Sequence, residues 1–175
     1  MKHTTKTGFS LIELLITILI SSIMLGIFFP SMKSISNEYN FNSLQQHLIL
    51  DLTYTRSEAI NQGGVVTICP SNNNTSCFSR LSDWSHGWII FSDIDANGIY
   101  DPGSDDILRA YEVQRRVAIT WSGNNPISFL GSGLATGIST GSFKICDSDG
   151  DSSIAKGVSI TLNGRIRPSS SVSCP

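Results

Sequence analysis

The sequence has few of the residues from which catalytic and metal sites are usually built. Its 175 residues include only three histidines and four cysteines. His3, His47 and His86 lie in separate segments, and none stands in a motif that would place it beside a nucleophile. The cysteines lack the paired short spacings of a zinc site, and the serines show no nucleophile-elbow pattern. We therefore expect neither an enzyme nor a cofactor-binding protein.

Charge is also scarce. With 12 Lys and Arg residues, 14 Asp and Glu residues and a net charge of −2, neither sign dominates and no partner is indicated. Six aspartates and no basic residue lie between Asp83 and Asp106, whereas Lys156, Arg165 and Arg167 follow Asp151 without any acid. The 40% content of hydrophobic residues is that of a folded protein. The sequence thus predicts an acidic folded domain with a weakly basic tail.

One long apolar run stands near the N-terminus. Residues 9–29 contain a single charge, Glu13, and at about 1.5 Å per residue a helix of this length spans the roughly 30 Å of a bilayer core. Lys2 and Lys6 precede the run, so the N-terminus is expected in the cytoplasm and the remainder across the inner membrane. The run exceeds the roughly 7–15 residues of a signal peptide and ends without a small-residue cleavage site. A plain signal anchor is the alternative, but it leaves the costly carboxylate of Glu13 unexplained.

The start of this run carries a recognisable motif. Gly8-Phe9-Ser10-Leu11-Ile12-Glu13-Leu14-Leu15 resembles the processing site of type IV prepilins and of the pseudopilins of type II secretion. The resemblance implies a leader over residues 1–8, cleavage after Gly8 by a prepilin peptidase and methylation of the new N-terminus at Phe9. Glu13 would then be the fifth residue of the mature chain. In lipid its carboxylate would pair with the α-amino group of a neighbouring subunit, and because an unpaired buried charge is costly, the pair would fix the register of assembly.

The rest of the chain changes from a helical to a strand-like pattern. Residues 30–62 are expected to continue the helix as an amphipathic segment that ends at Gly63-Gly64. Its apolar or small stripe consists of Phe41, Leu44, Leu48, Leu52, Thr55 and Ala59. Strands are expected at residues 65–69, 88–91, 117–121, 143–146 and 158–162, separated by turn residues. The predicted fold class is α+β, with a long N-terminal helix, membrane-spanning in its first half, packed on an antiparallel β domain over residues 63–175.

A second set of motifs narrows the family. The helix end Arg56–Ile60, the segment Val66–Cys69, and Trp84 with Gly87–Phe91 look like those of the GspH/FimT group. The resemblance implies a type IV pilin-like fold and a minor pilin that assembles with other pilins into a pilus, its C-terminal domain periplasmic. The equivalent minor pseudopilin of a type II secretion system is the alternative. A third class, an adhesin or binding module on a membrane stalk, is disfavoured by the leader and by Glu13.

The four cysteines are expected to form disulfides if the domain lies in an oxidising compartment. Pairing Cys69 with Cys77 would close a polar loop, and pairing Cys146 with Cys174 would pin the tail. Four cysteines allow three connectivities, so this pairing is a hypothesis.

An acidic segment raises a metal hypothesis. Asp93-Ile94-Asp95-Ala96-Asn97-Gly98 matches the first half of an EF-hand calcium loop, which makes Asp93, Asp95 and Asn97 candidate ligands. The position that should supply a bidentate Glu is Ser104, however, and Asp and Asn also favour plain turns. No metal site is therefore expected, with calcium the alternative.

The segment Asn163-Gly164-Arg165-Ile166-Arg167 is a candidate for DNA binding. On a strand, Arg165 and Arg167 would lie on one face about 7 Å apart, close to the phosphate spacing along one DNA strand. FimT-type pilins that take part in DNA uptake carry a similar Gly-Arg-x-Arg, so the resemblance implies contact with double-stranded DNA during natural transformation. Lys144 and Lys156 would widen the surface if the fold brings them to the same face. The alternative is an ordinary hairpin, because Asn-Gly is a turn signal and related pseudopilins also end in a basic strand.

Processing is the first testable consequence. Replacing Gly8 by Leu should leave the precursor uncut, because the peptidase must bring its catalytic groups against the Gly8–Phe9 bond. Mass spectrometry of the wild-type mature protein should find Phe9 at the N-terminus. An intact Met1, or cleavage after Phe29, would contradict the prepilin interpretation.

Overall fold

The computed structural model describes residues 8–113, 117–123, 125–147, 155–169 and 172–174, with the side chains of residues 27–38 left out of the description. Two compact units, Met1–Tyr39 and Asn40–Pro175, make up the chain. Of the expected leader, residues 1–8, only Gly8 is among the described residues.

The first unit consists mainly of the N-terminal part of helix α1, which spans Leu11–Gln62. The helix starts where the Ser10 carbonyl accepts bonds from the amides of Glu13 and Leu14. The large apolar side chains that the structure describes in this unit are uncovered. They are Phe9, Leu11, Ile12, Leu14, Leu15, Ile16, Ile18, Leu19, Ile20, Ile23, Met24 and Leu25, each at least 49% exposed. The hydroxyls of Thr17, Ser21 and Ser22 donate to carbonyls of their own helix.

The expected membrane span, residues 9–29, lies partly outside the described side chains, which stop at Gly26 in this segment. Within the described part of the chain, no helix offers an apolar stretch long enough to cross a membrane.

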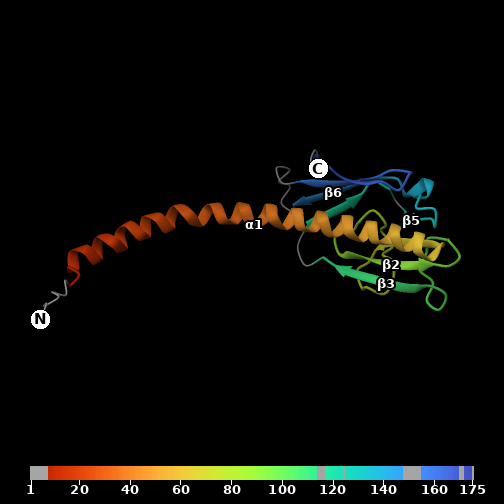
Figure 1. Cartoon of the computed structure of the whole chain (residues 1–175), viewed down its shortest axis with the longest axis horizontal. Coiled ribbons are helices and arrows are strands. Elements are labelled where there is room, and N and C mark those ends of the chain that lie inside the picture. Colours follow the sequence, from red (N-terminus) through yellow and green to blue (C-terminus); the bar gives the residue numbers. More distant parts are fainter. Residues whose placement is uncertain (1–7, 114–116, 124, 148–154, 170–171, 175) are drawn as a thin grey trace, which may run out of the picture. The chain divides into compact units, whose positions relative to one another are not determined.

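The second unit contains the later part of α1 and two antiparallel sheets (Figure 1). Sheet A has the order β3-β2-β1-β5, and sheet B the order β4-β6-β7-β8. The strands of sheet A are β1 (Val65–Pro70), β2 (Gly87–Asp93), β3 (Asp106–Glu112) and β5 (Ile127–Phe129). Those of sheet B are β4 (Val117–Trp121), β6 (Gly141–Asp147), β7 (Lys156–Ile160) and β8 (Ile166–Ser169), and a short 3-10 helix, η1, covers Gly137–Ser139.

The predicted helix and all five predicted strands are present. The helix ends at Gln62, and Gly63 takes the left-handed conformation with φ of 65°, as expected for a residue that terminates a helix. The sequence did not predict β3, an exposed edge strand, or β5, which has only three residues. The expectation for the basic segment was partly wrong, because Arg165 precedes β8 rather than lying within it. Gly164 has φ of 70°, which is incompatible with a strand.

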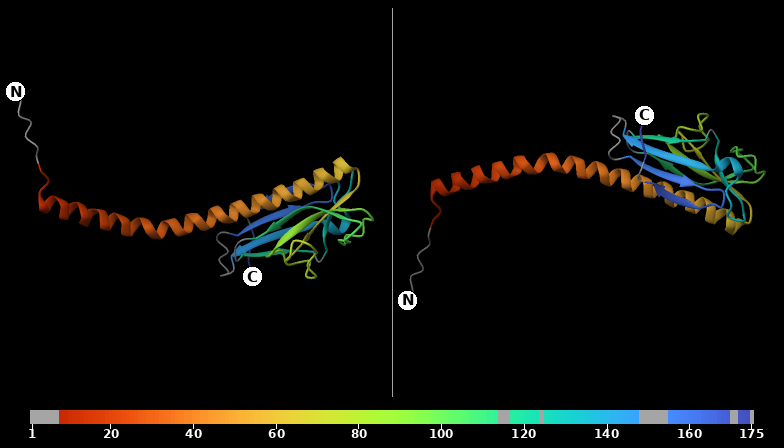
Figure 2. Two further views of the ribbon diagram at one scale, coloured as in Figure 1. Left: turned by 90° about the horizontal axis from the view of Figure 1, so that it is seen from below. Right: turned by 90° about the horizontal axis from the view of Figure 1, so that it is seen from above.

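The core lies between α1 and the inner faces of both sheets. The predicted helical stripe is buried throughout, with Leu48, Leu52, Thr55 and Ala59 fully covered. It packs against Val66, Ile68, Trp88, Ile90, Ile119, Trp121, Ile127, Phe129, Phe143, Ile145, Val158 and Ile160. Figure 2 shows this part of α1 lying along the sheets in two views. Because every described core residue belongs to residues 40–175, this unit should fold without the preceding segment.

A polar contact joins α1 to sheet A within this core. The indole nitrogen of Trp88 donates to Asp51 Oδ2 at 2.8 Å, and Arg109 reaches Asp51 Oδ1 at 3.4 Å. The Arg109 guanidinium also lies over the Tyr54 ring, 3.7 Å from its centroid. Asp51 is only 9% exposed, so its carboxylate depends on these partners for the hydrogen bonds it would have in water.

Two tryptophans allow the contribution of this bond to be measured. Trp88→Phe and Trp121→Phe remove the same atoms from sites that are 0% and 3% exposed. Trp88 loses its bond to Asp51, whereas the Trp121 indole nitrogen has no hydrogen-bond partner among the described residues. In urea unfolding of residues 40–175, Trp88→Phe should therefore cost about 1–3 kcal/mol more than Trp121→Phe. Equal costs would show that the Asp51 contact contributes nothing.

Candidate functional site

The expected processing and assembly residues lie at the exposed start of α1. Gly8 and Phe9 precede the helix, and Phe9 is 78% exposed. Chain neighbours aside, no heavy atom of the described residues lies within 4 Å of the position that a Cβ would take at Gly8. Glu13 lies in the first helical turn, where the helix dipole favours a negative charge. Its carboxylate has no partner within the described part of the chain and remains available to a second molecule.

The candidate DNA-binding residues lie at the turn that joins β7 to β8. The Thr161 amide donates to the Arg165 carbonyl at 3.1 Å, and the Gly164 amide donates to the Thr161 carbonyl at 2.8 Å. Asn163 Oδ1 accepts from the Arg165 amide at 3.4 Å and from the Thr161 hydroxyl. A Cβ at Gly164 would come within 2.1 Å of the Gly133 carbonyl oxygen, so only glycine fits this tightly packed turn.

Arg165 and Arg167 are exposed and line the same surface hollow, of about 560 Å³, as expected for residues two apart on one face. Leu134, Leu162 and Asn163 also line it. Neither arginine lies within ion-pair distance of a carboxylate among the described residues. Their charge is therefore not neutralised within this part of the fold.

The two candidate lysines divide between the faces of sheet B. Paired residues on neighbouring strands share a face of the sheet, and Arg167 is linked in this way through Ser159 to Ser142. Lys144 lies two residues from Ser142 and therefore on the same face as Arg167. The Lys144 amine donates to the carbonyl of Ser173 at 3.2 Å. Lys156 pairs with Ile145 and lies on the opposite face. Of the two, only Lys144 can extend the surface of Arg165 and Arg167.

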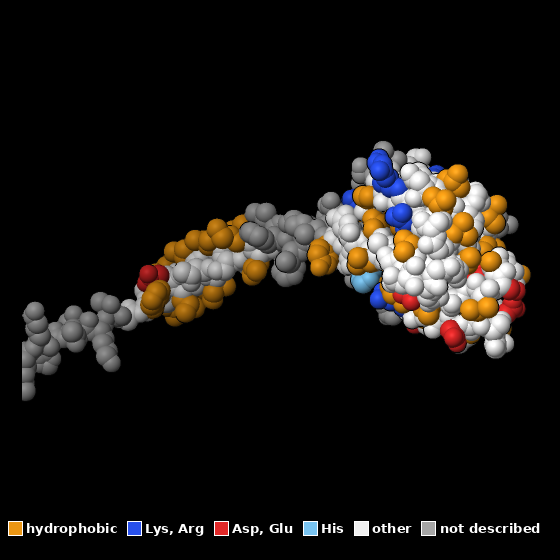
Figure 3. All heavy atoms as spheres, turned by 45° about the vertical axis from the view of Figure 1, so that its right-hand side comes forward, with side chains coloured by type: hydrophobic (Ala, Val, Ile, Leu, Met, Phe, Trp, Pro, Cys, Tyr) orange, Lys and Arg blue, Asp and Glu red, His pale blue; other side chains and the backbone are white. Residues whose placement is uncertain are grey.

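The acidic stretch and the arginine turn lie on different parts of the second unit. In Figure 3 the Lys and Arg side chains at the top of the unit lie away from the Asp and Glu side chains at its lower right. The acidic stretch belongs to sheet A and the loop between β2 and β3, whereas the arginine turn belongs to sheet B. An anion at the arginine turn therefore does not face the acidic stretch.

Two family models match the sequence. The prokaryotic N-terminal methylation motif matches residues 4–29, and the model for the type II transport protein GspH matches residues 45–164, more than half of the chain. The chain belongs to the GspH family of type IV pilin-like proteins. This confirms the family and the fold that the sequence motifs imply, and it places the chain among pilin-like subunits of type IV pili and type II secretion systems.

Solved structures share this fold. The type IV minor pilin FimU of Pseudomonas aeruginosa is 22% identical with a TM-score of 0.56, over 76% of this chain and 90% of that one. The minor pseudopilin EpsH of the Vibrio cholerae type 2 secretion system is 14% identical with a TM-score of 0.51, over 73% of this chain and 94% of that one. Among curated proteins, none matches the sequence.

This GspH-family domain contains both expected disulfides, Cys69–Cys77 and Cys146–Cys174. The first fixes a loop over the outer face of sheet A, where Cys69, Ile89 and Phe91 form a second buried cluster. The second attaches the C-terminal segment to β6. Val172 of that segment lies 2.6 Å from the position of a Cβ at Gly157, so the segment covers the outer face of sheet B at this point.

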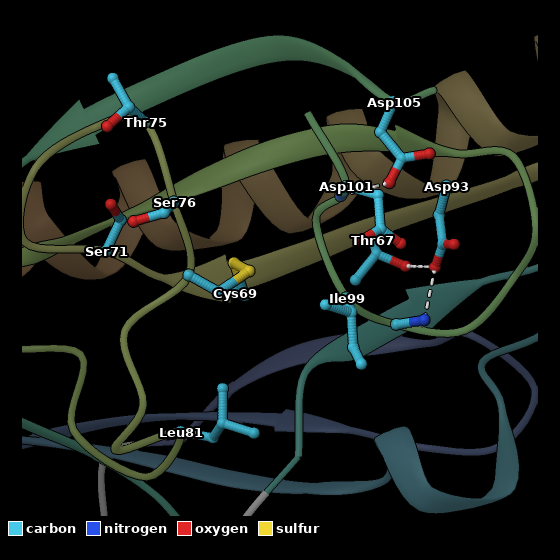
Figure 4. The surroundings of a disulfide bond; sticks show 12 residues. Thr67, Cys69, Ser71, Thr75, Ser76, Leu81, Asp93, Ile99, Asp101 and Asp105 are labelled. Carbon is cyan, nitrogen blue, oxygen red and sulfur yellow. Dashed lines mark hydrogen bonds between the residues drawn. A yellow bond between two sulfur atoms is a disulfide. The ribbon is translucent and has the colours of Figure 1, made fainter. Parts of the chain in front are cut away.

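The candidate calcium loop is closed by its own hydrogen bonds. Asp93 is 1% exposed and accepts from the Thr67 hydroxyl at 2.7 Å (Figure 4). It also accepts from the Asn97 and Gly98 amides at 3.1 and 3.0 Å. Asp95 Oδ1 accepts from the same Asn97 amide at 3.2 Å, and Asn97 Oδ1 accepts from the Ile99 amide at 2.6 Å. Within the described ranges, no group of three or more His, Cys, Asp or Glu side chains is placed to hold a metal. Calcium binding by Asp93, Asp95 and Asn97 stays a prediction, because oxygens that accept these hydrogen bonds keep lone pairs for a metal.

Burial makes Asp93 sensitive to pH. Its removal from water raises the pKa of the Asp93 carboxyl above the ordinary value of 3.8, and the nearby Asp105 charge raises it further. The bonds from Thr67, Gly98 and Asn97 act in the opposite direction but do not cancel the rise. The folded protein therefore holds the Asp93 proton more tightly than the unfolded chain does.

This predicts a loss of stability with rising pH. The contribution of Asp93 is fully present below its unfolded pKa of 3.8 and declines as pH rises through the higher folded value. Relative to Asp93→Asn, the wild type should lose at most about 1.4 kcal/mol of unfolding free energy per pH unit in that window. Urea unfolding at a series of pH values measures this, with exposed Asp106→Asn as the control. A pH-independent difference between wild type and Asp93→Asn would contradict the assignment.

Proposed function

We propose that this chain is a minor pilin of a type IV pilus, made as a precursor and held in the inner membrane by residues 9–29 before assembly. Its N-terminus lies in the cytoplasm and residues 63–175 lie in the periplasm. A prepilin peptidase cuts after Gly8, and Phe9 is methylated. The observation that carries the proposal is the uncovered apolar helix surface over residues 9–25, which lipid must cover before assembly and neighbouring subunits afterwards.

Glu13 supplies the assembly contact. It is the one charge in this apolar segment, and its carboxylate has no partner among the described residues. In the assembled filament, the positively charged α-amino group of Phe9 in an adjacent subunit lies near the same depth as Glu13. Pairing the two charges removes the penalty of an uncompensated buried ion, and a shift in register would break the pair.

The same subunit presents Arg165 and Arg167 to double-stranded DNA in natural transformation. The two guanidiniums line one hollow, are not neutralised by carboxylates of the described fold, and carry the bidentate donors that suit phosphate oxygens. Contacts of this type are independent of base sequence, as DNA uptake requires.

The alternative function is that of a minor pseudopilin in a type II secretion system. It is favoured by the description of the matching family model, type II transport protein GspH. Both machines use the same apolar helix and the same lone carboxylate. The phenotype of a deletion strain is therefore what distinguishes the two functions.

A deletion strain tests the proposal. Loss of the chain should abolish surface pili and transformation and leave enzyme secretion intact. Expression of Arg165→Ala/Arg167→Ala should restore pili, because neither side chain supports the core, but should reduce transformation at least tenfold. The conservative Arg165→Lys/Arg167→Lys variant is the control and should retain most transformation. Normal pili with a loss of enzyme secretion would instead establish the pseudopilin function.

A further inference from the structure

A second hollow lies on the other side of Arg165. It has a volume of about 360 Å³ and lies between the α1 residues Thr53 and Arg56 and the turn residues Asn163, Gly164 and Arg165. Thr53 and Arg56 are three positions apart and therefore share one face of the helix. Arg165 thus lines both hollows, whereas Arg167 lines only the first and Arg56 only the second.

Arg56 is held in place beside this turn. Its Nε donates to the Gly133 carbonyl at 2.8 Å, and this is the same carbonyl against which Gly164 packs. That bond uses one of the five guanidinium N–H groups, and no other hydrogen bond or ion pair is described for Arg56. The helix carboxylates near it are engaged elsewhere, since Glu58 accepts from Gln62 and Asp51 from Trp88.

We propose that Arg56 is a third phosphate-binding residue, which with Arg165 and Arg167 forms a row of cations along one strand of DNA. This rests on the proposed DNA function and assigns to it a residue on the helix. Asn163 lines both hollows, and because its Oδ1 faces the turn, its amide nitrogen is left as a neutral donor within the row. Amide donors beside guanidiniums are typical of contacts with phosphate oxygens.

The bond to the Gly133 carbonyl suggests a second role for Arg56, that of holding the turn in place. The experiment must separate this structural role from phosphate binding. A residue that only holds the turn acts through its hydrogen bond, and lysine cannot reproduce the planar guanidinium geometry. A residue that binds phosphate acts through its charge, which lysine retains. Phosphate binding by Arg56 itself makes the number of counterions released from DNA depend on its charge, so Arg56→Lys and Arg56→Gln differ in salt slope only in this second role.

The test is a titration of fluorescently labelled duplex DNA with residues 40–175 at several salt concentrations. Arg56→Gln should reduce the slope of log affinity against log salt by about 0.9, which is about a fivefold loss of affinity at 0.15 M salt. Arg56→Lys should keep most of that slope. Arg80→Gln is the matched control, because it removes the same charge from an exposed site outside both hollows and should leave the slope unchanged.

A second pair of variants leaves the Gly133 bond untouched. Thr53 is exposed and lines the hollow, so Thr53→Asp places a negative charge beside Arg56, whereas Thr53→Asn does not. Thr53→Asp should weaken DNA binding at least fivefold relative to Thr53→Asn, with the two domains unfolding at similar temperatures. Because Arg165 lines the same hollow, the pair is compared in the Arg165→Ala background as well, where a loss in Thr53→Asp acts through Arg56 even if Arg56→Gln fails to fold.

The outcomes distinguish this inference from the proposed function. Absence of DNA binding by the wild type would overturn both. Loss of binding in Arg165→Ala/Arg167→Ala, with an unchanged salt slope in Arg56→Gln and equal binding by the two Thr53 variants, would overturn only the role of Arg56. Equal losses of slope in Arg56→Lys and Arg56→Gln would also overturn it and would leave Arg56 as a residue that holds the turn.

Discussion

The apolar side chains of helix α1 are buried by its own domain in one part and exposed in the other, and most of the structure follows from this difference. Over residues 41–59 the apolar stripe of α1 is buried by the sheets of its own domain. Over residues 9–25 the same helix exposes large apolar side chains around its surface, and nothing in the described chain covers them. Under the proposed function, lipid and then other subunits bury this area. The buried stripe thus belongs to the domain's own core, whereas the exposed stretch is the assembly element of the proposed function.

The domain stabilises its own end of the helix with contacts that connect distant segments. Asp51 receives Trp88 and Arg109 from neighbouring strands, and Arg56 reaches the carbonyl of Gly133. Each bond satisfies a polar group at a point where the helix meets a sheet or a loop. Because buried polar groups tolerate few alternative partners, these contacts select one arrangement of the helix on the sheets as well as stabilising it.

The loops on the outer faces of the sheets are fixed by a different means. Disulfides attach the loop after β1 and the C-terminal segment, and the buried carboxylate of Asp93 closes the acidic loop after β2. The acidic loop thereby stays on sheet A, and the arginine turn stays on sheet B. Separation of the two charges lets a domain of net negative charge offer a local cationic surface.

The sequence alone determined the features that depend on local patterns. The apolar run, the processing motif, the helical stripe ending at Gly63 and five strands could all be predicted, because each is encoded by neighbouring residues or by a short spacing. The pairing of the cysteines was one of three connectivities, and the tertiary structure selected it. The sequence did not predict β3, whose exposed edge position gives no clean alternation, or β5, which is too short to show a period. Only the tertiary structure placed Lys156 on the face opposite Arg167, engaged the oxygens of Asp93 and Asn97 with backbone amides, and brought Arg56 beside Arg165. These outcomes depend on strand register and on the packing of a helix against a distant turn, and neither is encoded in any single segment of the chain.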